Sequence, residues 1–130
     1  MEYIFFVINF TKSEHDVHWA FSVVDVKNKT ISFYDSVKNM SRDYYNGHCV
    51  CQDVKKFLRS TNFIRDIPAC DWKLEYPETP QQTDSNSCGV FCCQLAKQLS
   101  RNQLLKLETK DIPFLRKEMT CELSLGVLFM

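Results

Sequence analysis

The stretch from Gly89 to Leu99 constrains the fold most, because apolar residues cover most of the surface it would have as a helix. A helix of that kind is stable only where other elements bury it. The chain must therefore provide secondary structure on several sides of this segment, and we expect it to be a central buried helix. The apolar positions are Val90, Phe91, Cys92, Cys93, Leu95, Ala96 and Leu99.

Two neighbouring stretches rich in aromatic and β-branched residues predict a β-hairpin. They are Trp19 to Val26 and Thr30 to Tyr34, and they flank a turn of Lys27, Asn28 and Lys29. Asn28 tolerates the left-handed conformation that such turns need. We also expect a buried strand at Tyr3 to Asn9, where the apolar run is nearly continuous.

The remaining segments predict one more strand and two more helices. Trp72 to Tyr76 alternates apolar and charged residues, as a half-buried strand does. Asp43 to Ser60 has apolar residues spaced by three and four, which favours an amphipathic helix that Gly47 weakens in its first turns. Asp111 is the expected cap of a last helix that continues to about Leu128. The order of elements predicts an α+β fold.

Length and charge limit the kinds of protein the chain can be. Its 130 residues contain no repeat or Pro/Gly linker, so residues 1–130 are expected to form a single domain. Sixteen basic residues balance sixteen acidic ones, so we expect no nucleic-acid or membrane partner. No export signal precedes the seven cysteines, an odd number without framework spacing. This indicates reduced thiols in an intracellular protein, nuclear or cytoplasmic.

Cys88 is the cysteine with the most distinctive position, because it precedes the buried helix immediately. Unpaired backbone N–H groups and the helix dipole favour a thiolate there. Cys92 and Cys93 lie inside the helix, where thiols usually act as small hydrophobes. Taken by itself, Cys88 is more often another buried thiol than a nucleophile, because a nucleophile also needs a base, an orienting partner and oxyanion donors.

The hairpin supplies a candidate base and its partner. If Lys27 and Asn28 form the turn, His18 lies opposite Val37, and Asp35 becomes its diagonal neighbour on the same face at about 7–8 Å between backbones. A slip of one residue would separate the two faces. The other histidines, His15 and His48, are predicted to be solvated.

Gln82 lies six residues before Cys88 and is a candidate oxyanion donor together with the backbone N–H of Cys88. The alternative is a solvated loop glutamine. Zinc is not favoured, because Cys88, Cys92 and Cys93 contain no C-x₂-C pair and Cys49-x-Cys51 is too tight for common structural sites. We expect neither a metal nor a cofactor.

These motifs occur in an order that resembles a known family. VHW, a strand, YDS, PQQ, Cys-Gly six residues later and an apolar helix are similar to the catalytic core of the ubiquitin-like-protein-specific proteases, the Ulp/sentrin-specific SUMO cysteine peptidases. IPFLRKEM near the C-terminus looks like the family's closing segment. The resemblance implies a papain-like fold, in which a mixed sheet packs against a central helix that carries the nucleophile.

The resemblance also implies roles for individual residues. His18 matches the general base, Asp35 the residue that orients it, Gln82 the oxyanion donor and Cys88 the nucleophile. Trp19 matches a wall of the tunnel that holds the modifier's diglycine tail. Ser87 stands where the family usually has an aspartate.

The implied function is that of a monomeric peptidase or isopeptidase that cleaves after the C-terminal Gly-Gly of a ubiquitin-like modifier, with SUMO and its conjugates as the expected partners. The family's catalytic domain extends upstream of the first strand, so the chain is expected to lack that part. Two alternatives stay open. One is an inactive modifier-binding remnant, and the other is a protease of the same fold for another modifier or a viral polyprotein.

Overall fold

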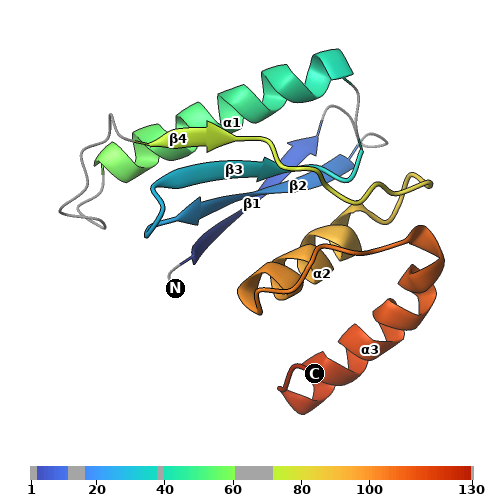
Figure 1. Ribbon diagram of the computed structural model, residues 1–130. Coiled ribbons are helices and arrows are strands. Elements are labelled where there is room, and N and C mark those ends of the chain that lie inside the picture. The colour runs from blue at the N-terminus through green and yellow to red at the C-terminus, as the bar shows by residue number, and fades with distance from the viewer. Residues whose placement is uncertain (1–2, 12–16, 38–39, 61–71, 130) are drawn as a thin grey trace.

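A mixed sheet of four strands forms the middle of the molecule (Figure 1). The computed structural model describes residues 3–11, 17–37, 40–60 and 72–129. Strands β1 (Tyr3–Thr11), β2 (Val17–Asp25) and β3 (Thr30–Tyr34) are antiparallel neighbours, and β4 (Lys73–Glu75) pairs in parallel with β3. The predicted α+β fold class is confirmed.

Helices cover both faces of the sheet, which explains why β2 is apolar along most of its length. Ala20 and Val24 belong to the core under α1 (Met40–Ser60). Phe21 and Val23 point to the opposite face and pack with α2 (Cys88–Ser100). α3 (Ile112–Leu125) follows the short 3-10 helix η2 (Thr109–Asp111) and lies beyond α2, so the layers run α1, sheet, α2, α3 (Figure 1). The predicted central helix is the layer between the sheet and α3.

The β2–β3 hairpin has the predicted register. Asp25 pairs with Thr30 and Phe21 with Tyr34, the same register that places His18 opposite Val37. The left-handed residue of the turn is Lys29 (φ 57°), and the expectation that Asn28 would take this role is wrong. Asn28 instead donates from its backbone and its side chain to the Asp25 carboxylate, at 3.1 and 2.8 Å. That bonding holds Asn28 inside the turn.

Strand β1 differs from its prediction as a buried strand. It lies at the edge of the sheet next to β2, and Val7 is 64% exposed. Its apolar run therefore supports one covered face and leaves the other partly open. β1 also extends two residues beyond Asn9, whereas β4 is shorter than the predicted range from Trp72 to Tyr76.

Gly47 explains how α1 approaches the sheet. This helix begins at Met40, three residues before the predicted start. Gly47 is buried, and a Cβ atom at this position would lie 2.8 Å from the Phe33 Cδ1 atom and 2.9 Å from the Tyr76 Cε1 atom. The glycine that weakens the helix in isolation therefore permits its close contact with β3 and the segment after β4.

The last helix ends earlier than predicted. α3 stops at Leu125 because Gly126 adopts a left-handed conformation (φ 71°), and the N–H groups of Gly126 and Val127 bond to the carbonyl of Glu122. Asp111 precedes the helix as expected, although its side chain makes no capping hydrogen bond. None of the described helices combines the length and apolar character needed to cross a membrane.

Candidate active site

His18 and Asp35 meet at the open end of the hairpin. The His18 Nε2 atom lies 2.6 Å from the Asp35 Oδ1 atom, although the residues are 17 positions apart in sequence. The side chains are 24% and 8% exposed, respectively, so the carboxylate is sheltered while the imidazole keeps one side accessible. The proximity expected from the hairpin register is confirmed. A buried carboxylate on one ring nitrogen orients the imidazole and supports its cationic form.

The Asp35 carboxylate and its backbone have further partners that fix their position. The Val37 N–H donates to the Asp35 Oδ1 atom at 2.9 Å. The side-chain amide of Gln81 donates to the Asp35 carbonyl at 3.0 Å and to the Thr79 carbonyl at 2.9 Å. Gln81 is exposed, as a solvated loop residue would be, but it ties the loop before α2 to the end of β3.

Cys88 lies at the N-terminus of the buried helix as predicted, although α2 begins at Cys88 itself and not at Gly89, and its side chain is buried (6% exposed). Burial raises the pKa of the Cys92 thiol to about 12, with smaller contributions from Cys88, Cys93 and Asp35. Burial also raises the pKa of the Cys51 thiol to about 11 and that of Cys93 above its usual value. The raised pKa values favour the protonated thiols of Cys51 and Cys92 at neutral pH, while Cys88 occupies the first position of α2.

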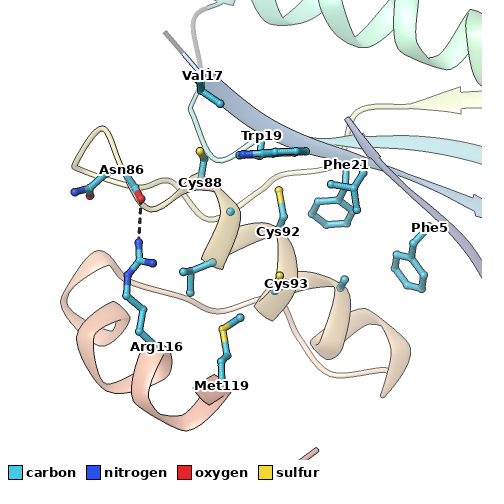
Figure 2. Close-up of a pocket in the computed structure, with 14 residues that line it drawn as sticks. Phe5, Val17, Trp19, Phe21, Asn86, Cys88, Cys92, Cys93, Arg116 and Met119 are labelled. Atoms are coloured by element: carbon cyan, nitrogen blue, oxygen red, sulfur yellow. Dashed lines mark hydrogen bonds between the residues drawn. The ribbon is translucent and has the colours of Figure 1, made fainter. Parts of the chain in front are cut away.

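A groove of about 680 Å³ begins at Cys88 and runs between the sheet and the two C-terminal helices. Figure 2 shows the Cys88 side chain beside the Trp19 indole, with Phe21 and Phe5 farther along the sheet side. A Cβ atom on Gly89 would lie 3.9 Å from Trp19 Cδ1, at ordinary van der Waals distance, so the helix start faces the indole. The groove is thus suited to an extended, mainly apolar segment that reaches the thiol.

Arg116 of α3 braces the loop that leads to Cys88. Its Nη2 atom donates to the Asn86 carbonyl at 3.0 Å, the contact drawn in Figure 2. Lys97 joins the other end of α2 to α3 through Glu122 at 2.9 Å. α3 therefore holds α2 at both ends.

Gln82 is anchored to the residue that follows Asp35. Its backbone N–H donates to the Ser36 carbonyl at 2.9 Å, and the Ser36 hydroxyl donates to the Gln82 Oε1 atom at 2.6 Å. The Gln82 Nε2 atom points to Asp84, 2.9 Å from its carbonyl oxygen and 3.3 Å from its Oδ1 atom. The Gln82 amide, the candidate oxyanion donor, thus has a defined orientation, and the longer of its two contacts is the weaker one.

The five residues singled out from sequence gather at one end of the fold. His18 contacts Asp35, Gln82 bonds to its neighbour Ser36, and Trp19, next to His18, lines the groove with Cys88. Their catalytic and binding roles stay predictions. The sequence reasoning missed Ser36 and Gln81, whose contacts join segments 46 positions apart. Their only signal was proximity to Asp35 and Gln82 in the YDS and PQQ motifs.

The other candidate residues lie away from this end or outside the described part. His48 is exposed on α1, and His15 falls among residues that the structure does not describe. Within the described ranges, no three His, Cys, Asp or Glu residues are grouped closely enough to hold a metal ion. The chemistry available at the site is that of a thiol, an imidazole, a carboxylate and amide donors.

Comparison with known families decides the relationship. The model of the Ulp1 protease family, C-terminal catalytic domain, matches residues 1–125. The chain belongs to the Ulp1 protease family. This confirms the resemblance found in the motifs and the predicted membership of a protease family.

Relatives in this family are much longer than the chain. Human sentrin-specific protease 2 is 26% identical over 113 residues, which cover 82% of the chain and 18% of that protein. Human sentrin-specific protease 5 is 31% identical over 111 residues, covering 83% and 14%, respectively. The chain therefore spans less than a fifth of the length of these curated relatives.

Solved Ulp1 structures share the fold. The Ulp1 protease domain in complex with Smt3, the yeast ortholog of SUMO, has a TM-score of 0.70 at 27% identity and covers 88% of the chain and 48% of that domain. Ulp1 with its catalytic cysteine oxidised to a sulfonic acid has a TM-score of 0.73 at 27% identity, with coverage of 88% and 49%. The chain thus spans about half of these Ulp1 domains. ChlaDub1 from Chlamydia trachomatis, at 16% identity and a TM-score of 0.53, supports the fold alone.

Proposed function

We propose that the chain is the catalytic part of a cysteine peptidase that cleaves after the C-terminal Gly-Gly of a ubiquitin-like modifier, with SUMO as the modifier. The observation that carries this proposal is the 2.6 Å contact between the His18 Nε2 atom and the Asp35 Oδ1 atom, at the same end of the fold as the groove that begins at Cys88. A thiol protease needs a base, a partner that orients it and an activated thiol, and this end of the fold holds a residue of each type.

The steps follow from these residues. His18 takes the proton of the Cys88 thiol, and Asp35 stabilises the imidazolium that forms. The thiolate attacks the carbonyl carbon of the terminal glycine, while Gln82 and backbone N–H groups stabilise the oxyanion. The amine leaves with the proton from His18, and water then releases the acyl-enzyme as a carboxylate and a free thiol.

The groove beside Cys88 supports a diglycine tail as the bound segment. Trp19 forms one wall, and a glycine backbone can approach an indole more closely than other residues because it carries no Cβ atom. The Ulp1 domain, similar in fold at 27% identity, was solved in complex with Smt3, which supports SUMO as the modifier. We place the protein inside the cell, in the nucleus or cytoplasm, as a monomer without nucleic-acid or membrane partners.

A segment upstream of β1 is part of the proposal, because the chain spans about half of the solved Ulp1 domains. Trp19 supplies one wall for the tail, and holding a flexible tail in reacting geometry can supply roughly 7–11 kcal/mol of a barrier, so residues that close the other side should contribute strongly to cleavage. We expect the 130 residues alone to cleave a SUMO precursor poorly. An upstream segment from a close relative, joined to the chain or added separately, should restore cleavage.

The test uses SUMO and ubiquitin probes that carry a C-terminal electrophile, with the Cys88→Ala variant as the matched control. The expected result is a covalent adduct of the SUMO probe at Cys88, mapped by peptide mass spectrometry. A small substrate, an N-blocked Gly-Gly p-nitrophenyl ester, measures chemistry that needs little modifier-binding surface. Adduct formation at another cysteine, or equal ester turnover by Cys88→Ala, would refute the peptidase. Binding of SUMO without any adduct would favour the modifier-binding remnant.

A further inference from the structure

Asp84 occupies a central position in the loop between the candidate oxyanion donor and the nucleophile. The Gln82 Nε2 atom donates to the Asp84 carbonyl oxygen at 2.9 Å and approaches its Oδ1 atom at 3.3 Å. The Ser87 hydroxyl donates to the other carboxylate oxygen, Oδ2, at 2.5 Å. One side chain thus joins a residue six positions before Cys88 to the residue directly before it.

Ser87 is buried, and both its carbonyl and its hydroxyl are hydrogen-bonded. It is 1% exposed, and its carbonyl accepts the first hydrogen bond of α2, from the Phe91 N–H at 2.9 Å. A serine at this position usually accepts a hydrogen bond from the first helical turn with its side chain, but Ser87 makes no such bond. Its hydroxyl is turned to Asp84 instead. The contact therefore replaces an ordinary helix cap with a link to the Gln82 loop.

We infer that Asp84 is the positioning residue for the Gln82 amide. It holds the amide at a fixed position relative to the start of α2, and so relative to Cys88. The inference rests on the proposed function, because a register between Gln82 and Cys88 matters only if both act on one carbonyl group. Ser36 holds the Oε1 atom of the same amide at 2.6 Å, so Asp84 determines where the Nε2 atom points. When the oxyanion takes the hydrogen of the 3.3 Å contact, the Ser87 hydroxyl still holds the Asp84 carboxylate, and the Asp84 carbonyl keeps its 2.9 Å contact with the Nε2 atom.

Substitutions of Asp84 can show whether its hydrogen bonds to Gln82 and Ser87 or its negative charge matters. Both carboxylate oxygens of Asp84 accept, one from Gln82 and one from Ser87. An asparagine can keep this geometry, because its oxygen accepts from Gln82 and its NH₂ group donates to the Ser87 oxygen, whose hydroxyl hydrogen rotates away. An alanine removes both links. Asp84→Asn should therefore restore what Asp84→Ala loses.

The experiment measures two reactions of Cys88 in the 130-residue chain. Hydrolysis of the N-blocked Gly-Gly p-nitrophenyl ester passes through an oxyanion, whereas alkylation by iodoacetamide does not. Loss of one oxyanion donor costs about 10²–10³-fold in kcat, so a misdirected donor should cost about 10-fold. We expect Asp84→Ala to lower kcat about 10-fold at nearly unchanged KM, with alkylation of Cys88 unchanged and Asp84→Asn within about three-fold of the parent. Asp111→Ala, an exposed aspartate at the start of α3, is the matched control and should match the parent in both reactions.

Ser87→Ala and the double variant complete the test. If the two side chains act through one bridge, their effects on kcat should combine to less than the product of the single effects. Equal losses in hydrolysis and alkylation for Asp84→Ala would show a collapsed helix start and overturn the inference. Turnover that depends on Cys88 but not on Asp84 would overturn the inference and leave the proposed function intact. Turnover that does not depend on Cys88 would overturn both.

Discussion

Replacing Asp35 by asparagine measures how much one negative charge contributes to catalysis, because the hydrogen bonds around this side chain can be kept. The Val37 N–H and the His18 Nε2 atom are both hydrogen-bonded to the Oδ1 atom of Asp35, at 2.9 and 2.6 Å. The carbonyl oxygen of an asparagine can remain there and keep both hydrogen bonds. What disappears is the charge that supports the imidazolium of His18 in the transition state.

The magnitude follows from the strengths of the two kinds of hydrogen bond. Bonds to charged groups contribute about 1.5–3 kcal/mol and neutral bonds about 0.5–1.5 kcal/mol, so Asp35→Asn should lose about 1–1.5 kcal/mol. At about 1.4 kcal/mol per decade, kcat/KM should fall about ten-fold. If the amide rotates and donates to His18, the wrong tautomer results, and losses approach the roughly 10⁴-fold seen for the equivalent change in serine proteases.

The assay is kcat/KM for the Gly-Gly ester and for a SUMO precursor with the upstream segment restored. Asp25→Asn is the matched control, because Asp25 lies at the turn end of the same hairpin and holds Asn28. It should leave kcat/KM unchanged, and His18→Ala should be at least as damaging as Asp35→Asn. Activity of Asp35→Asn within about three-fold of the parent, with the fold intact by circular dichroism, would refute the geometric reasoning.

Two further predictions concern thiol reactivity and packing. Brief iodoacetamide treatment at pH 7, followed by peptide mapping, should label Cys88 before the other cysteines. The alkylation rate of Cys92, whose pKa is raised to about 12, should increase about ten-fold per pH unit as its thiol deprotonates. Labelling of any other cysteine first would contradict the assigned nucleophile. Gly47→Ala should lower the free energy of unfolding in urea by about 1 kcal/mol, because a Cβ atom would lie 2.8 Å from Phe33 and the overpacking cost of about 1–3 kcal/mol exceeds the gain in helix propensity. The exposed helical residue Asp53, changed to alanine, is the control, and a Gly47→Ala variant more stable than the parent would disprove the close-packing argument.

The part of the site built on the hairpin could be predicted from sequence because it depends on local periodicity. Residues of a strand alternate between faces, so one turn assignment determines which side chains share a face over the whole ladder. The turn assignment was therefore sufficient to predict that His18 and Asp35 lie close together. The turn residue itself was assigned wrongly, because Lys29 adopts the left-handed conformation, while Asn28 donates from its backbone and side chain to the Asp25 carboxylate.

The loop before α2 could not be predicted in the same way. Ser36 and Gln81 owe their roles to contacts across 46 positions, and no periodic pattern encodes such a distance. Gly47 was interpreted from its helix propensity alone, whereas its value lies in the ring of Phe33 that packs against it. Tertiary contacts outweighed local preference at each of these positions.

The candidate base and nucleophile belong to different layers of the molecule. His18 and Asp35 lie on the sheet, and Cys88 lies at the start of a helix held to the sheet by Phe91, Leu95 and their apolar neighbours. On the proposed function, the catalytic set is therefore complete only when α2 has packed against the sheet, so detachment of this one helix would abolish activity while leaving the contact between His18 and Asp35 in place.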